Sequence, residues 1–113
     1  MDLYEQITKL MAELTASIRK LRDNGVKLAE AERDYKITLR NEALKLRSGD
    51  MPVTLINQII YGVPEVAEKR LNRDIAQANY DANHEHINIV KLQLRLLEAQ
   101  IEREYSISGK GDI

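Results

Sequence analysis

The chain has 113 residues, of which 43% are hydrophobic and 31% are charged, and its formal net charge is -1. It contains no Cys, which excludes disulfides, thiolate zinc sites and cysteine nucleophiles. The near balance of 17 basic and 18 acidic residues gives no overall attraction to nucleic acid or to an anionic membrane.

The first predicted element is a helix over about residues 2–47. Apolar residues recur there at alternating spacings of four and three, the heptad pattern of a helix that packs along one seam. The predicted seam consists of Leu3, Ile7, Leu10, Leu14, Ser17, Leu21, Asn24, Leu28, Ala31 and Tyr35. A neighbouring stripe consists of Met11, Ile18, Leu39, Ala43 and Leu46. Two stripes predict a helix that buries against more than one neighbour.

Gly25 is the one residue that could interrupt this helix. Asp23-Asn24-Gly25 resembles a turn signal. The heptad phase nevertheless continues across it, from Leu21 to Leu28, and tertiary packing can offset the helix penalty of about 1 kcal/mol for a glycine. We therefore favour one continuous helix over a break at Gly25.

A compact linker is predicted next. Ser48-Gly49-Asp50 ends the first helix, Pro52 suits the first position of a short helix over about 52–61, and Gly62 ends that helix. Residues 51–64, MPVTLINQIIYGVP, form the most apolar stretch of the chain. One interpretation is that this segment closes the open end of a helical pair. The other is that it faces a protein partner, because large exposed apolar patches usually mark interaction sites. The candidate partner contacts are Ile59, Ile60 and Tyr61.

The last predicted helix covers about residues 64–105 and begins at Pro64. Its predicted seam consists of Leu71, Ile75, Ala78, Ala82, Ile89, Leu92, Leu96 and Ala99. A second stripe consists of Val90, Leu94, Leu97 and Ile101. Residues 106–113 are predicted to form a disordered tail.

Together these elements predict an all-α fold, a long antiparallel helical hairpin with a short connecting helix, in one domain over residues 1–105. A hairpin alone would leave the second stripes in water. We therefore expect a homo-oligomer, a dimer in the first instance, in which the helices form a bundle. Whether the long helices pair within one chain or swap between chains stays open.

Basic residues concentrate near the predicted linker and suggest a nucleic-acid contact. In a hairpin, the end of the first helix meets the start of the last, so basic residues from both could follow a phosphate backbone. The candidate residues are Arg33, Lys36, Arg40, Arg47, Lys69, Arg70 and Arg73. The alternative is that they form the solvated face of a coiled coil, because few aromatic side chains accompany them.

No catalytic, metal or cofactor motif is found, and we expect no enzyme activity, metal or cofactor. His84 and His86 are two residues apart and point away from each other on a helix, whereas a helical metal pair needs a spacing of three or four. No glycine-rich phosphate loop is present.

No apolar run approaches the roughly 20 residues of a membrane span. The N-terminus lacks the pattern of a signal peptide, so we expect a soluble cytoplasmic protein.

Four segments carry a resemblance to known proteins: LYEQITKLMAEL, KLAEAERDYKITLRNEALKLR, MPVTLINQIIYGVPEVAEKR and LQLRLLEAQIEREY. Over about residues 2–105 the chain resembles small all-helical proteins encoded by phages and prophages of Gram-positive bacteria. That family has no assigned activity, so no functional residues carry over. The resemblance implies an accessory role, either in phage DNA metabolism or as an inhibitor of a bacterial defence system.

Three functions therefore remain in view. The first is an adaptor or inhibitor that binds a host or phage protein. The second is a nucleic-acid-binding accessory of replication or recombination. The third is a coiled-coil scaffold that acts as a spacer.

Overall fold

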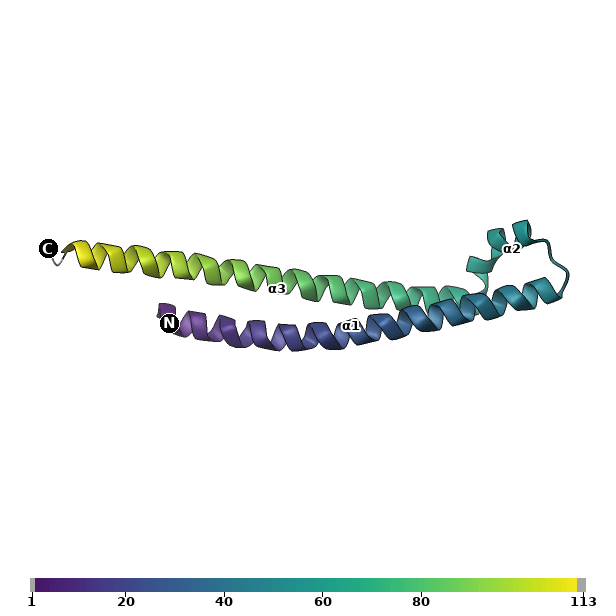
Figure 1. Ribbon diagram of the computed structural model, residues 1–113, viewed down its shortest axis with the longest axis horizontal. Coiled ribbons are helices and arrows are strands. Elements are labelled where there is room, and N and C mark those ends of the chain that lie inside the picture. The colour runs from purple at the N-terminus through teal and green to yellow at the C-terminus, as the bar shows by residue number, and fades with distance from the viewer. Residues whose placement is uncertain (1, 112–113) are drawn as a thin grey trace. The chain divides into compact units, whose positions relative to one another are not determined.

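The computed structural model describes the backbone of residues 2–111 and the side chains of residues 2–107. The described residues form the long helices α1 (Leu3–Ser48) and α3 (Pro64–Gly111). Between them lie the short helix α2 (Val53–Ile59) and the 3₁₀ helix η1 (Ile60–Gly62) (Figure 1). The predicted all-α helical hairpin with a short connecting helix is confirmed.

The chain divides into two compact units. The terminal unit combines Met1–Arg22 with Ala82–Ile113, and the linker unit is Asp23–Asp81. In each unit a segment of α1 lies beside a segment of α3 and runs in the opposite direction (Figure 1). The linker unit also holds α2 and η1.

Helix α1 forms as the sequence predicts. Asp2 caps its start, because the Asp2 carboxylate accepts a hydrogen bond of 2.8 Å from the backbone N–H of Glu5. The helix continues through Gly25 without a break. All ten predicted seam positions of α1 are buried or half-buried, so that prediction is confirmed. The second stripe divides: Met11 and Ile18 are exposed, whereas Leu39, Ala43 and Leu46 pack against the linker core.

A Schellman motif ends α1. Asp50 adopts a left-handed conformation with a φ of 62°. The N–H of Asp50 donates to the carbonyl of Arg47 at 3.0 Å, and the N–H of Met51 donates to the carbonyl of Leu46 at 3.4 Å. Met51 and Leu46 both pack against the same core, the apolar contact that usually accompanies this motif. The left-handed residue is thus Asp50, and Gly49 keeps a negative φ.

The core of the linker unit gathers residues from all four elements. Tyr35, Ile56, Ile60 and Val66 are buried together, and each is at most 7% exposed. They come from α1, α2, η1 and α3 in turn. The linker therefore does close the end of the helical pair, one of the two interpretations that its sequence allows.

The seam of α3 differs from the prediction. The buried or half-buried positions in the terminal unit are Asn83, Ile87, Val90, Leu94, Leu97 and Ile101. In the linker unit they are Val66, Lys69, Arg73, Ala76 and Tyr80. All eight residues of the predicted α3 seam are exposed, and the stripe that was predicted to be secondary is the packed one. The error has a physical cause: α3 carries two apolar stripes of the same heptad spacing, and polar residues interrupt the packed one.

The end of α3 also differs from the prediction. The helix continues to Gly111 instead of ending near residue 105. Residues 106–111 are therefore helical rather than part of the expected disordered tail, because no proline or early glycine stops the helix at Ser106-Ile107-Ser108. The last two residues of the expected tail, 112 and 113, lie outside the described residues.

Candidate interaction surfaces

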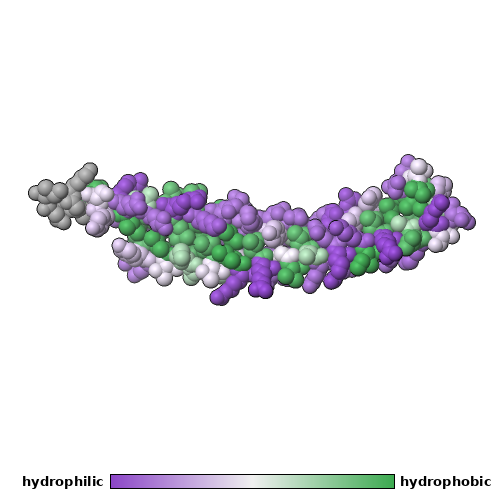
Figure 2. All heavy atoms as spheres, in the orientation of Figure 1, coloured by the Kyte–Doolittle hydropathy of each residue, from purple (hydrophilic) through white to green (hydrophobic). Residues whose placement is uncertain are grey.

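The first surface is the outer side of the linker, here named the linker patch and defined as Val53, Leu55, Ile59 and Tyr61. These side chains are 56%, 41%, 39% and 47% exposed, respectively. No residue from 51 to 64 is charged, in a chain that is 31% charged. Figure 2 shows the corresponding apolar surface over α2. The uncharged run signals this surface in the sequence, although Val53 and Leu55 were not among the candidates.

The predicted partner contacts Ile59, Ile60 and Tyr61 separate in the structure. Ile59 and Tyr61 belong to the linker patch, but Ile60 is only 4% exposed and lies in the core. Consecutive helical residues point about 100° apart, so the three side chains face different directions, and Ile60 is the one that turns to the core. Ile60 therefore supports the linker patch from beneath instead of forming part of it.

Tyr61 also has a cationic neighbour. The guanidinium carbon of Arg70 lies 5.1 Å from the centre of the Tyr61 ring, a cation–π arrangement. Arg70 comes from the first turns of α3, so the stack joins η1 to α3 at the edge of the linker patch. Tyrosine and arginine are the side chains that most often dominate the binding energy of protein interfaces.

The second surface is the outer stripe of the terminal unit, defined as Ala82, Ile89, Leu92, Leu96 and Ala99. Each of these residues is exposed, with values of 46% for Ile89, 49% for Leu92 and 61% for Leu96. At 100° per residue, Leu92 points about 160° away from its seam neighbours Val90 and Leu94. Helix α3 therefore presents apolar side chains on two opposite sides, and α1 covers only one of them.

A groove runs along one side of the terminal unit, between α1 and α3. Its lining residues are Gln6, Lys9, Leu10, Glu13, His86, Ile89, Gln93, Leu96, Leu97 and Gln100. His86 Nε2 lies 3.1 Å from Glu13 Oε1 across the groove, and both side chains are more than 40% exposed. Ile89 and Leu96 belong to both the groove and the outer stripe, so apolar surface continues from one into the other. Figure 2 shows apolar side chains at the surface of this unit.

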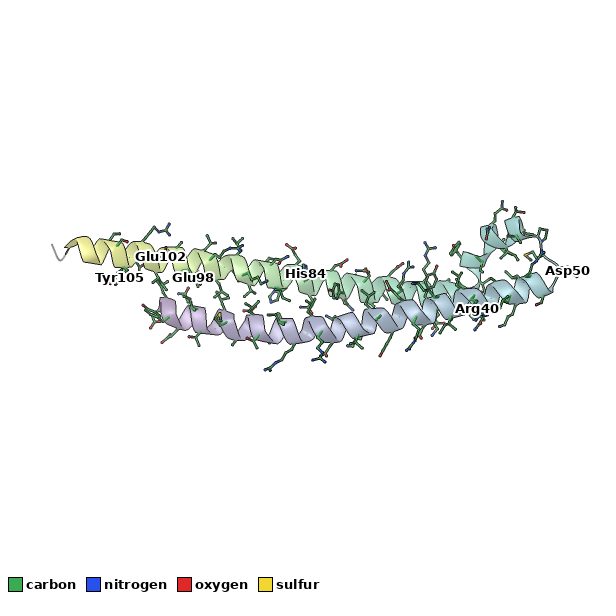
Figure 3. All side chains as sticks on the ribbon, in the orientation of Figure 1. Arg40, Asp50, His84, Glu98, Glu102 and Tyr105 are labelled. Carbon is green, nitrogen blue, oxygen red and sulfur yellow. The ribbon has the colours of Figure 1, made fainter. Side chains whose placement is uncertain are left out.

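The predicted nucleic-acid residues do not form one surface. Lys69 and Arg73 are half-buried on the α3 seam, whereas Arg40, labelled in Figure 3, is exposed on α1. Counting 100° per residue from the α1 seam, Arg33 and Arg40 point away from α3. The two groups of cations therefore face different directions.

Several of these cations also have partners within the chain. Arg33 pairs with Asp34 at 3.1 Å, and Arg47 donates to the carbonyl of Met51 at 3.1 Å. Arg73 pairs with Asp74 at 2.8 Å, and its guanidinium lies 4.6 Å from the centre of the Tyr35 ring. Hydrogen bonding to Asp74 raises the pKa of Arg73.

The polar groove beside these cations carries no excess of positive charge. Three carboxylates and two ammonium groups contribute to its lining: Glu42, Glu65, Glu68, Lys45 and Lys69. The Glu42 carboxylate accepts a hydrogen bond of 2.9 Å from Lys45 and raises the pKa of that lysine. A surface with this balance of charge would repel phosphate as much as attract it.

Two features are absent from the described part of the chain: a cluster of three metal ligands and a helix that could span a membrane. No group of three His, Asp or Glu side chains there is arranged to hold a metal ion. His84, labelled in Figure 3, is exposed on α3. Neither of the long helices, over the residues described, has an apolar window able to cross a bilayer.

No protein-family model, curated protein or solved structure matches this chain.

Proposed function

We propose that this chain is a non-catalytic adaptor or inhibitor that binds a protein partner through the linker patch. One observation carries the proposal: four large apolar side chains stand exposed on the uncharged segment that forms α2 and η1. Exposed patches of this kind usually mark interaction sites. The core residues Ile56 and Ile60 hold the patch from beneath. Binding therefore loses little conformational entropy at the patch, because folding has already ordered it.

The chemistry of the linker patch specifies the kind of partner. Leu55 and Ile59 lie four apart on one side of α2 and offer an apolar surface. At its edge the Arg70 guanidinium stacks on Tyr61. We therefore expect the partner to present an apolar pocket bordered by a carboxylate. The resemblance to phage proteins supports a narrower form of the proposal, in which the partner is a host protein such as a defence factor.

The test is capture of a protein from a bacterial lysate by the wild-type chain and by two variants. Ile59→Glu places a charge in the linker patch, and Ile37→Glu makes the same change at an exposed position of α1 that is 51% exposed. We expect one protein to bind to the wild type and to Ile37→Glu but not to Ile59→Glu. A protein that all three capture equally would contradict the role of the patch, and capture of none would contradict the proposal.

The geometry supports nucleic-acid binding less well than it supports binding of a protein partner. The candidate cations divide between the seam and the outer face, and the nearby groove carries more carboxylates than ammonium groups. We expect no gel shift of single- or double-stranded DNA at about 150 mM salt. A shift that disappears in Lys36→Glu/Arg40→Glu and weakens steeply with salt would favour the nucleic-acid function instead.

A further inference from the structure

We infer that a second copy of this chain packs on the outer stripe, with the two α3 helices antiparallel. The stripe follows heptad spacing, with Glu85 at its remaining position, and each of its residues is exposed in the described structure. Covering the second apolar side of α3 removes it from water and is therefore favourable. In the terminal unit α1 covers the side of Val90 and Leu94, which leaves the side of Leu92 and Leu96 for another chain.

The order of residue sizes in the outer stripe favours pairing with itself. The stripe begins with Ala82 and ends with Ala99, and its large residues Ile89, Leu92 and Leu96 lie between. In an antiparallel pair centred between residues 90 and 91, Ala82 faces Ala99 of the second copy. Ile89 then faces Leu92 of the second copy, and the reverse contact follows by symmetry. A two-fold interface requires this kind of self-complementary surface.

The charges beside the outer stripe specify the direction of pairing. Glu85 occupies the remaining heptad position of the stripe, and Arg95 lies next to Leu96. The antiparallel register places Glu85 opposite Leu96 of the second copy and beside Arg95 of that copy, and it does so twice. A parallel pair would instead place Glu85 against Glu85 of the second copy, and like charges in contact oppose association.

The other flank of the outer stripe is uncharged. His86, Gln93 and Gln100 follow one another at heptad spacing along it. Interface cores are depleted of charged residues, and uncharged polar side chains can hydrogen-bond at the rim. Helix α1 borders this flank through the groove, where Glu13 lies 3.1 Å from His86, so the second copy approaches from the side of Leu92, away from α1.

The chain exposes more surface than a compact protein of its mass. The chain exposes 8502 Å². A monomeric globular protein of 13.0 kDa exposes about 6,300 Å². The excess of the whole chain, about 2,200 Å², is larger than the roughly 800 Å² that each partner buries in a standard interface.

The first test is the solution mass of the full chain by light scattering. We expect the wild type to be a dimer, at twice 13.0 kDa, and Leu92→Glu to be a monomer with unchanged helical circular dichroism. Leu44→Glu is the matched control, since Leu44 is 54% exposed on α1, and it should remain a dimer. A monomeric wild type would overturn the proposal and leave the stripe to a different protein. A dimeric Leu92→Glu, or a monomeric Leu44→Glu, would overturn the assignment of the surface.

The second test determines the direction of pairing by cysteine cross-linking. The chain has no native Cys, so every disulfide must join introduced residues. Ala82→Cys/Ala99→Cys should form a covalent dimer on oxidation, whereas either single variant should not. Cross-linking of the single variants would show a parallel pair and overturn the antiparallel one. Glu85→Arg should weaken the dimer at least tenfold, and Glu85→Arg/Arg95→Glu should restore it. An unchanged dimer in Glu85→Arg would contradict the proposed ion pairs.

Discussion

Asn83 on α3 reaches across to α1, where its side-chain amide Nδ2 donates a hydrogen bond of 3.1 Å to the backbone carbonyl of Ser17. Both residues are buried, at 8% and 7% exposure. A buried amide in an apolar seam can be satisfied in only one alignment of the two helices. This pair therefore fixes the register of α1 against α3 within the terminal unit.

Replacing Asn83 by Ala should lower the free energy of unfolding by about 1 to 2 kcal/mol, because the hydrogen bond is lost and its space is left unfilled. Urea denaturation followed by circular dichroism measures the change. Asn88→Ala is the control, since Asn88 is exposed on the same helix, and it should change stability by less than about 0.5 kcal/mol. Equal effects of the two substitutions would contradict the register role of Asn83.

Asp50→Gly should stabilise the protein by about 0.5 to 1 kcal/mol, because glycine adopts the left-handed conformation without the steric cost that Asp50 bears at a φ of 62°. Gly49→Ala should be close to neutral, since its φ is not positive and an added Cβ would meet the Leu46 carbonyl at 3.5 Å. Thermal unfolding of the two variants tests both statements. A destabilised Asp50→Gly would show that the Asp50 side chain contributes more than its backbone strain costs.

Gly25→Ala should stabilise the protein by up to about 1 kcal/mol through helix propensity. The added Cβ would lie 3.5 Å from Cε2 of Tyr80, an ordinary van der Waals contact. The reverse change at an exposed position of the same helix, Ala29→Gly, should cost a similar amount. If Gly25→Ala lowers the melting temperature instead, the Tyr80 ring needs the space that glycine leaves.

Two adjacent isoleucines should respond differently to truncation. Ile60→Ala should cost about 2 to 5 kcal/mol, because Ile60 is 4% exposed in the linker core. Ile59→Ala should cost about 1 kcal/mol or less, because Ile59 is 39% exposed. Chemical denaturation measures the loss in the free energy of unfolding at each position. Similar losses at both positions would mean that Ile59 belongs to the core.

The sequence predicts α1 more accurately than α3 for a physical reason. Along α1 one stripe dominates, and its two polar entries, Ser17 and Asn24, do not break the heptad phase. Along α3 the packed seam includes Lys69 and Arg73, residue types that normally indicate a solvated face. Arg73 is tolerated there because its guanidinium stacks on the Tyr35 ring, a contact that no local pattern reveals.

The candidate sites were predictable only in part. The absence of charge between residues 51 and 64 indicates an interaction surface, but the division between Ile59 and Ile60 depends on how η1 turns against α1. The basic cluster looked continuous because the seven cations lie near one another in the hairpin. The directions of Lys69 and Arg73 depend on which stripe of α3 faces α1, and the packed stripe includes the polar residues Tyr80 and Asn83.

The core built by Tyr35, Ile56, Ile60 and Val66 has a consequence for how the chain folds. Its members lie close together in sequence, so forming it closes only short loops, whereas pairing Leu10 with the region of Leu97 closes nearly the whole chain. Local contacts form first when the entropy of loop closure limits the rate. We expect the linker unit to nucleate folding, and the remaining helical turns to pair outward from it towards the two chain ends.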